Sequence, residues 1–390
     1  MVGTLLDAFR SIYSTQNDIR VFRAPGRVNL IGEHTDYNLG FVLPAALDLA
    51  TFVATAPAGD GKLRIYSEHK QQMREWNVAT IPFLERERDW TDYPMGVARE
   101  LVRAGFGVRP LKLLIRSTVP EGSGLSSSAA LEVSSALAML QGRRIGRLEL
   151  AQLCQRAEHN FVGIPCGIMD QYVSIFGQEH SAIELDCRSF EHLPVYLPEG
   201  AAFLVVNSMV KHALAGSAYK DRVAECAAAV EALRGRYSSV ESLRDVGPEE
   251  FDAVAGSLPP VIAKRARHVI TENRRVALFV EAAKGADLGA MGKLLVESHR
   301  SLQHDYEVSC AELDFLVDTA IRLDGVCGAR MTGGGFGGSI VVMLPPEALA
   351  GFRERISEAY RQRFHRTPEI YPCNPSAGAA ELTNFETIPS

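Results

Sequence analysis

The sequence predicts a mixed α and β protein that is built from two domains. At 390 residues the chain is longer than one ordinary domain, and two domains of about 200 residues each are expected. Strand-like apolar runs gather in the first part of the chain, whereas helical spacing fills much of the second half. Hydrophobic residues make up 46% and charged residues 23% of the chain, which are ordinary values for a globular protein.

The first region predicts one helix followed by several strands of a largely antiparallel sheet. Residues 4–15 have the apolar spacing of a helix. Strand patterns follow at residues 19–23, 41–43, 49–56 and 63–66. Because residues 58–61 (AGDG) are typical of a turn, we expect a hairpin between the last two of these strands.

The middle of the chain predicts three helices, one strand and a domain boundary. The helices cover residues 90–104, 129–140 and 147–161, and the strand covers residues 111–116. Pro194 and the run Pro198-Glu199-Gly200 mark the best boundary. We therefore expect an N-terminal domain at residues 1–197 and a C-terminal domain at residues 198–390.

The second domain is expected to be rich in helices around a few strands. Helical spacing is clearest at residues 219–233, 312–323 and 345–364, and strand patterns cover residues 201–207, 327–331 and 339–344. The last two strands flank a Gly-rich loop at residues 333–338. The last twenty residues show no clear pattern, and a terminal strand that returns to the first domain is one option.

Charge and cysteine content exclude several classes of protein. The formal charge is −6 and no basic tract stands out, which argues against nucleic-acid binding. The seven cysteines form no C-x-x-C pair, so a reduced compartment is favoured over a disulfide framework. The N-terminus lacks a signal-peptide pattern, and no apolar stretch reaches the length of a membrane span. We therefore expect a cytoplasmic protein without nucleic-acid or membrane partners.

One short run, residues 24–38 (APGRVNLIGEHTDYN), concentrates side chains suited to chemistry. Its Pro and Gly residues indicate a loop with short extended pieces. Arg27 offers a rigid fork of donors that suits phosphate oxygens. Glu33, His34 and Asp36 offer acceptors and a tunable donor, which suit hydroxyl groups. From residue types alone, a solvated charged turn is the alternative.

A second run, residues 120–130 (PEGSGLSSSAA), lies between a predicted strand and a predicted helix. Gly122 and Gly124 allow the backbone to approach a ligand closely. Three serines follow at the helix N-terminus, where unpaired N–H groups favour an anion. The run is neither a Walker-A loop nor a Rossmann fingerprint, and ordinary helix capping is the alternative.

Two further runs carry candidate residues. Residues 330–338 (RMTGGGFGG) hold five glycines within six residues, and a loop that approaches other chain segments closely explains them better than a flexible hairpin. Residues 158–171 (EHNFVGIPCGIMDQ) place Glu158 late in a helix and Asp170 after a loop broken by Gly and Pro. Together with the Gly-rich loops, these two acids become candidates for a metal ligand and a base.

The four runs, in this order, resemble those of the GHMP kinases, and the GEHTDYN run points to the galactokinase branch. The resemblance implies two α+β domains, the first similar to ribosomal protein S5 domain 2 and the second ferredoxin-like, with the active site in the cleft between them. It also implies an ATP-dependent, Mg²⁺-requiring kinase. Its reaction would be phosphorylation of the C1 hydroxyl of α-D-galactose, the first committed step of galactose catabolism in the Leloir pathway.

The resemblance assigns a role to each matched residue. Arg27 would stabilise the transferring phosphoryl group, and Asp170 would face the C1 hydroxyl as the candidate base. The implied sugar site consists of Glu33, His34, Thr35, Asp36, Gly167 and Tyr219, the last placed by the run His212 to Tyr219. The implied ATP site consists of Ser67, Gly122, Ser123, Gly124, Leu125, Ser126, Ser127 and Ser128, with Trp90 near the adenine. Ser128 and Glu158 would bind Mg²⁺.

Two other functions fit the same runs. One is a GHMP kinase for another sugar, such as N-acetylgalactosamine, galacturonate or arabinose. The other is a galactose-sensing regulator without catalysis, but the intact run 124–130 and Asp170 argue against it, because inactive relatives tend to lose residues there. The expected partners are thus galactose and MgATP, bound by a monomer.

Overall fold

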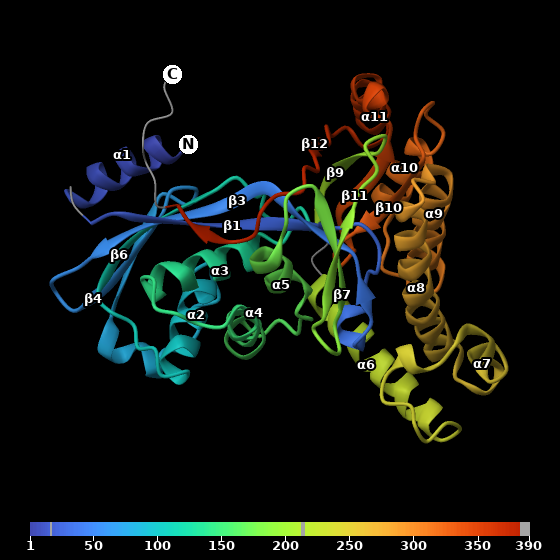
Figure 1. Ribbon diagram of the computed structural model, residues 1–390, viewed down its shortest axis with the longest axis horizontal. Helices are drawn as coiled ribbons and strands as arrows, with labels where there is room; N and C mark the ends of the chain where they lie inside the picture. Colours follow the sequence, from blue (N-terminus) through green and yellow to red (C-terminus); the bar gives the residue numbers. More distant parts are fainter. Residues whose placement is uncertain (16–17, 212–214, 383–390) are drawn as a thin grey trace.

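The computed structural model describes residues 1–15, 18–211 and 215–382. Two larger sheets with their helices lie end to end along the long axis of the molecule, and a small third sheet lies between them (Figure 1). The predicted mixture of helices and strands is therefore confirmed. No helix within the described ranges is long and apolar enough to cross a membrane.

The first sheet has six strands in the order β13-β1-β3-β6-β4-β5. Its strands are β1 (Arg20–Asn29), β3 (Pro44–Pro57), β4 (Lys62–Ser67), β5 (Gln72–Asn77), β6 (Leu111–Ser117) and β13 (Ala380–Glu381). One face is covered by α2 (Asp92–Arg103), α3 (Ser127–Leu140), α4 (Arg147–Arg156) and α5 (Met169–Phe176), and the other by α1 (Val2–Tyr13) (Figure 1). Side chains such as Val53, Leu113 and Met139 fill the core below the sheet.

The expected hairpin between the strands around residues 49–56 and 63–66 is wrong. β6 lies between β3 and β4, antiparallel to β3 and parallel to β4, and the hairpin partner of β4 is β5. The chain does reverse direction at residues 58–61, but local turn chemistry does not show that a strand from about 50 residues further along lies between the two strands. The sheet is still largely antiparallel, as predicted.

The second sheet has four antiparallel strands in the order β10-β11-β9-β12. They are β9 (Ala202–Lys211), β10 (Gly328–Thr332), β11 (Gly337–Leu344) and β12 (Glu369–Pro372). The helices of this part are α6 (Ala215–Arg234), α7 (Pro248–Asp252), α8 (Pro260–Lys284), α9 (Leu288–His304), α10 (Ala311–Ala320) and α11 (Leu349–Phe364). The predicted strands that flank the Gly-rich loop thus form the β10–β11 hairpin.

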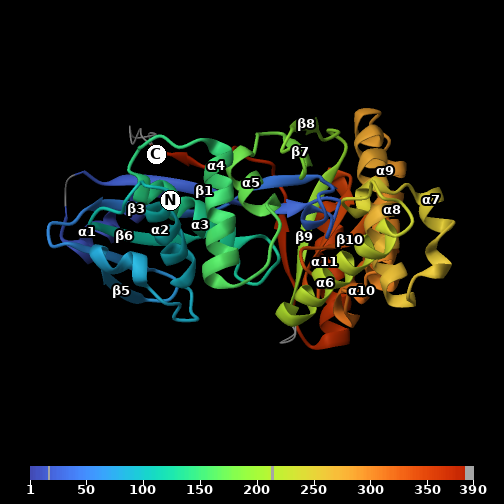
Figure 2. The same ribbon diagram turned by 90° about the horizontal axis from the view of Figure 1, so that it is seen from below.

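The third sheet and several short helices lie near the junction of the two parts. The third sheet contains β2 (Phe41–Val42), β7 (Ser181–Asp186) and β8 (His192–Tyr196), and it lies between the larger parts in both ribbon views (Figures 1 and 2). The short segments are η1 (Asp36–Asn38), η2 (Val78–Phe83), η3 (Ala157–Val162), η4 (Leu243–Asp245), η5 (Ala255–Ser257) and η6 (Pro346–Ala348). A buried cluster that includes Val28, Phe279 and Val341 joins the two parts.

Two local differences from the predicted elements matter for the site. The run at residues 24–38 is a loop only in its second half, because β1 continues through Pro25 and Gly26 to Asn29 with a register shift between Pro25 and Arg27. The helix predicted at residues 147–161 is α-helical to Arg156 and then widens into the π-helical segment η3. Such widened turns often occur at functional sites because they move a side chain relative to its neighbours.

Candidate active site

Arg27 and Asp170 form the central ion pair of the site. Arg27 lies on β1 next to the register shift, and Asp170 lies in the first turn of α5. The guanidinium donates from Nε and Nη2 to the two carboxylate oxygens, each at 2.8 Å, while Nη1 donates to the Gly124 carbonyl at 2.6 Å. Burial would lower the pKa of Arg27, but Asp170 and Glu33 outweigh that effect and raise it. The two parallel hydrogen bonds fix the orientation of both side chains relative to each other.

A cavity of about 170 Å³ opens beside this ion pair. Its walls come from both parts of the chain: Arg27, Glu33, His34, Asp36, Glu158, Ile164, Pro165, Cys166, Gly167, Met169, Asp170, Tyr219, Gly333 and Gly334. The structure thus brings together all the residues expected at the sugar except Thr35. Acceptors dominate this lining, so a ligand that offers several hydroxyl hydrogens suits the cavity.

Asp36 and Gly167 are in such close contact that a side chain on Gly167 would not fit. A Cβ atom built at Gly167 would lie 1.8 Å from Oδ2 of Asp36. Burial and the nearby Asp170 raise the pKa of Asp36 to about 7. Gly167 is therefore required for space, since the backbone of the 163–170 loop passes directly against the acid.

His34 presents one free ring nitrogen within the same cavity wall. Its backbone has a left-handed φ of 63°, a strained conformation that is common at ligand sites. Its Nδ1 lies 2.9 Å from the Tyr37 hydroxyl, whereas Nε2 is buried without a partner in the described part of the chain. Burial, together with His268 and Arg222, lowers the pKa of His34 to about 3, so the imidazole is neutral. A neutral ring can serve a ligand hydroxyl as donor or acceptor.

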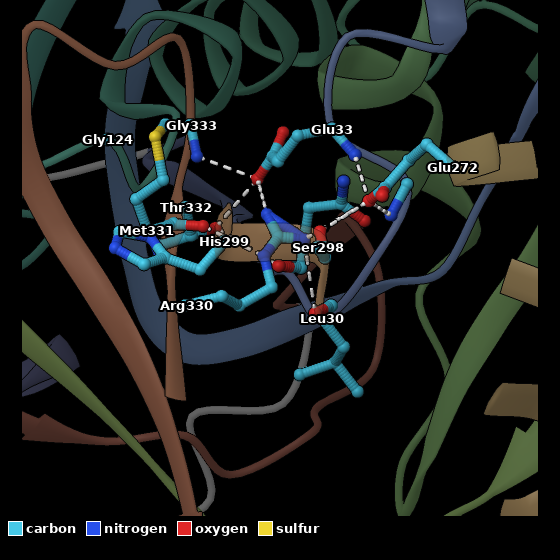
Figure 3. A network of polar contacts seen from close by, with 12 residues as sticks. Leu30, Glu33, Gly124, Glu272, Ser298, His299, Arg330, Met331, Thr332 and Gly333 are labelled. Carbon is cyan, nitrogen blue, oxygen red and sulfur yellow. Dashed lines mark hydrogen bonds and ion pairs between the residues drawn. The ribbon is translucent and has the colours of Figure 1, made fainter. Parts of the chain in front are cut away.

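Glu33 is anchored by the Gly-rich segment of the second part (Figure 3). Its Oε1 lies 2.7 Å from Nη2 of Arg330 and accepts from Thr332 Oγ1 at 3.0 Å and from the Gly333 N–H at 2.7 Å. Gly333 has a φ of 86°, which explains the glycine, and its backbone packs against Gly124. The Gly-rich run is therefore a close-approach loop, as its composition predicted.

Thr35 and Tyr219 complete the predicted sugar residues. Thr35 is fully buried, and its hydroxyl lies 2.8 Å from the Gly32 carbonyl and 2.7 Å from the Phe41 carbonyl, so it holds the loop rather than the cavity wall. Tyr219, on α6, packs its ring against His34 and Tyr37 and lines the cavity. Residues 212–214 of the run that predicted Tyr219 lie outside the described residues.

A second cavity, of about 200 Å³, lies at the N-terminus of α3. It is lined by Thr51, Ser67, His69, Lys70, Trp90, Tyr93, Ile115, Ser117, Glu121, Gly122, Ser127, Ser128 and Leu131. Four of the predicted ATP residues, namely Ser67, Gly122, Ser127 and Ser128, share this cavity with Trp90. A helix N-terminus beside an apolar wall suits a phosphate group attached to an aromatic base.

Ser123, Leu125 and Ser126 of the same run form hydrogen bonds that hold the loop before α3 in place. Ser123 is fully buried, and its hydroxyl donates to the Pro120 carbonyl at 2.8 Å. The Leu125 carbonyl accepts from the Arg27 N–H at 3.1 Å. Ser126 has a left-handed φ of 58°, and its hydroxyl donates to Oδ2 of Asp170 at 2.5 Å. The serine run therefore serves both cavities, which its spacing did not indicate.

Ser128 and Glu158 line different cavities, but Ser128 affects the ionisation of Glu158. Ser128 lines the second cavity, Glu158 lines the first, and the Ser128 side chain partly opposes the rise in the pKa of Glu158. Burial and Asp170 raise the pKa of Glu158 to about 7. Glu132, a buried neighbour, has its pKa raised by burial and by Glu158. A divalent cation would offset this crowded carboxylate charge, and Mg²⁺ accepts few protein oxygens alongside phosphate and water, so the donor set fits Mg²⁺.

Sequence reasoning missed three residues around the two cavities. The Gln171 amide donates to Glu132 Oε2 at 2.9 Å and to Glu158 Oε2 at 2.7 Å, and it follows Asp170 directly. Glu132 lies one helical turn after Ser128, a spacing that could have suggested a shared face. Arg330, which contacts Glu33, had no comparable signal, because its partner lies almost 300 residues away.

Comparisons with known proteins identify the family of the chain. Family models match at residues 7–57 (galactokinase galactose-binding signature), 92–178 (GHMP kinases N terminal domain) and 279–362 (GHMP kinases C terminal). A galactokinase of Chloroflexus aggregans is 43% identical over 97% of both chains, and one of Roseiflexus sp. is 42% identical over 97% of both.

Solved structures of related kinases have the same fold. The structure of Lactococcus lactis galactokinase complexed with galactose matches with a TM-score of 0.92 and 35% identity, covering 98% of this chain and all of that one. A mevalonate kinase, only 16% identical, matches with a TM-score of 0.65 over 91% of this chain and 98% of its own, which shows the shared fold. The protein is thus a kinase with the two-domain α+β fold of the GHMP kinases, as the resemblance implied.

Within that class, the chain belongs to the galactokinase family, and it transfers a phosphoryl group from ATP to galactose. The interpretation as a galactokinase is confirmed and favoured over a kinase for another sugar or a sensor without activity.

Proposed function

We propose that galactose occupies the cavity beside Arg27 and Asp170, and that ATP occupies the cavity beside Trp90. One observation carries this assignment: the serine run that lines the second cavity through Ser127 and Ser128 also donates from Ser126 to Asp170, which lines the first cavity. A sugar hydroxyl at Asp170 would then face the terminal phosphate at the N-terminus of α3. The galactose complex of the L. lactis relative supports a sugar site in this fold.

The proposed chemistry is a direct phosphoryl transfer. The C1 hydroxyl oxygen attacks the γ-phosphorus, the bond from the γ-phosphorus to the bridging oxygen breaks, and ADP leaves. Asp170 orients the hydroxyl and accepts its proton. Arg27 neutralises charge on the transferring group while its pairing keeps Asp170 in place, which is the positioning and charge stabilisation that phosphoryl transfer requires.

The sugar would be held by side chains with complementary roles. Oε2 of Glu33 and the carboxylate of Asp36 would accept hydroxyl hydrogens, and His34 would contact a further hydroxyl through Nε2. Tyr219 would cover the sugar ring. Gly167, which has no side chain, would leave space for the carboxylate of Asp36. Thr35 would contribute by holding the loop in shape, because its hydroxyl already lies against two carbonyls.

The nucleotide would use the α3 N-terminus and its supporting loop. Gly122, Ser127 and Ser128 would contact the phosphates, backbone groups of residues 123–126 would shape the loop, and Ser67 and Trp90 would border the base. Ser128 and Glu158 would hold Mg²⁺. When bound, the ion supplies positive charge that offsets the charge of the phosphate oxygens.

We further propose a monomer of two domains, divided near residue 197, that works in the cytoplasm. The return of β13 to β1 supports a C-terminal segment that closes onto the first domain. The seven cysteines are all free, which supports a reduced compartment. Light scattering after size-exclusion chromatography would check the oligomeric state.

A coupled ADP-release assay across a panel of sugars tests the assignment of the sugar site. We expect kcat/KM to be at least ~10²-fold higher for galactose than for glucose, since a misplaced C4 hydroxyl leaves buried polar groups unpaired. Asp36→Ala should reduce this preference as well as weaken binding. A preference unchanged in that variant would remove Asp36 from the sugar site, and a higher value for N-acetylgalactosamine would redefine the substrate.

A further inference from the structure

The carboxylate of Glu33 is divided between two environments. Oε1 is surrounded by three groups from β10 and the residue after it, namely Arg330 Nη2, Thr332 Oγ1 and the Gly333 N–H. No hydrogen bond from the described part of the chain reaches Oε2, while Glu33 lines the cavity beside Asp170. Oε1 thus has its partners within the protein, and Oε2 is the oxygen left for a ligand.

Arg330 is the charged member of that anchor, and it is completely buried. Its Nε donates to the Met331 carbonyl at 2.8 Å and its Nη1 to the Leu30 carbonyl at 3.3 Å, so the guanidinium has little freedom to turn. Figure 3 shows it lying between Glu33 and Glu272. A planar fork with several fixed contacts defines a direction, which the point charge of a lysine would not do.

Glu272, on α8, holds the backbone of the same loop. Its Oε1 accepts from the Gly32 N–H at 2.9 Å, from the Glu33 N–H at 3.3 Å and from Ser298 Oγ at 2.7 Å (Figure 3). Arg330 Nη1 lies 3.9 Å from that oxygen. Glu272 therefore fixes the main chain of Glu33 and Arg330 fixes its side chain. These two oppositely charged residues are also in contact with each other.

A purely stabilising role explains this arrangement poorly. Replacing a buried ion network with apolar side chains is often neutral or stabilising, so buried charge is weak support for a stability role. Here the network ends on a carboxylate whose second oxygen faces the sugar cavity. The same Gly333 that bonds Glu33 packs on Gly124, whose carbonyl accepts from Arg27. The network thus connects the sugar acid to the residues around the phosphoryl group.

We propose that Arg330 is a positioning residue for galactose recognition: it directs Oε2 of Glu33 into the cavity by holding Oε1. The proposal rests on the assignment of Glu33 to the sugar site. Arg330 does not touch the ligand in this scheme. It acts through Glu33, so its loss should affect sugar binding without an equal effect on the nucleotide.

Arg330→Lys is the primary test, and Arg275→Lys is its matched control. Arg275 Nε donates to Oε2 of Glu272 at 2.7 Å, so it belongs to the same buried network but does not contact Glu33. Calorimetric titration with galactose in the absence of nucleotide gives the sugar Kd, steady-state assays give the KM for ATP, and thermal melting reports stability. We expect Arg330→Lys to raise the galactose Kd about tenfold and to change the ATP KM less than twofold. Arg275→Lys should keep the wild-type galactose Kd even if its Tm falls.

Two further variants keep the outcome decisive. Thr332→Val removes one donor to Oε1 with little change in volume, and it should raise the galactose Kd roughly threefold even if Arg330→Lys does not fold. Glu33→Gln tests the underlying assignment, and its effect should not add to that of Arg330→Lys in a double-mutant cycle. A wild-type Kd in Glu33→Gln would remove the sugar role of Glu33 and the proposal with it. If Glu33→Gln weakens binding but Arg330→Lys and Thr332→Val lower only the Tm, Arg330 is structural and the proposal alone is overturned.

Discussion

The guanidinium of Arg27 and the carboxylate of Asp170 meet fork to fork, with 2.8 Å at both contacts, although the two residues are 143 positions apart. Arg27 also reaches the Gly124 carbonyl at the edge of the phosphate loop. Asp170 in turn accepts from Ser126. One ion pair therefore fixes the proposed base relative to the loop that would carry ATP.

Breaking that ion pair should reduce turnover more than binding. Asp170→Asn should lower kcat by roughly 10²- to 10⁴-fold, because it removes the proposed proton acceptor. Arg27→Lys should also lower kcat, since one ammonium cannot satisfy both carboxylate oxygens and the Gly124 carbonyl in the same geometry. Steady-state kinetics with galactose and ATP measure both effects. Arg64→Lys, at the surface pair with Asp60, is the control and should match wild type; near-normal kcat in Asp170→Asn would contradict the assigned role.

Removing either proposed metal ligand should change the Mg²⁺ dependence. Glu158→Ala and Ser128→Ala should each shift the Mg²⁺ concentration for half-maximal activity upward, with a smaller change in galactose KM, because each residue supplies an oxygen from one of the two cavities. Ser134→Ala, on the same helix but bonded to the Ala130 carbonyl, is the control. Metal titrations at fixed ATP provide the comparison, and identical curves for all four proteins would rule out the assignment.

Galactose affinity should depend on pH around neutrality through Asp36. Burial and Asp170 raise the pKa of this acid to about 7, with Glu33 adding to the rise and Arg27 opposing it. Below this pH the side chain is protonated and is a poorer acceptor for a sugar hydroxyl. Galactose KM should therefore fall as pH rises from 6 to 8, by roughly tenfold per unit at most on the acid side. In Asp36→Asn this dependence should disappear; if the variant keeps the wild-type slope, another group is responsible.

Adding one methyl group at Gly167 should damage the sugar site. The Cβ of Gly167→Ala would collide with Oδ2 of Asp36, so the acid must leave its position or the loop must shift. We expect galactose KM to rise roughly tenfold or more, as an oriented hydrogen-bonding group is displaced. Gly59→Ala, where a Cβ meets no atom within 4 Å, should retain wild-type kinetics. The two variants compared by KM and Tm separate a local clash from a general loss of stability.

The sequence by itself predicted the class of the protein and most residues of the candidate site. Most of the candidate residues lie in short runs whose composition is unusual for a surface loop. They are Arg27, the acids of residues 33–36, the serines of residues 126–128 and Asp170. Within such runs the chemistry is local, because the residues that act together are a few positions apart. The apolar runs of α3 and β11 were predicted close to their actual bounds for the same reason.

Only the tertiary structure decided which of these runs touch. β6 pairs with both β3 and β4 and lies between them. Ser126 donates a hydrogen bond to Asp170, and Arg330 forms an ion pair with Glu33. The spacing of residues in the sequence predicts none of these contacts. Turn and periodicity signals report backbone preferences over a few residues, whereas these pairings depend on which buried surfaces and charges match once the chain has closed long loops. The fold therefore determined the direction of each side chain, and with it the division of the candidate site into two cavities.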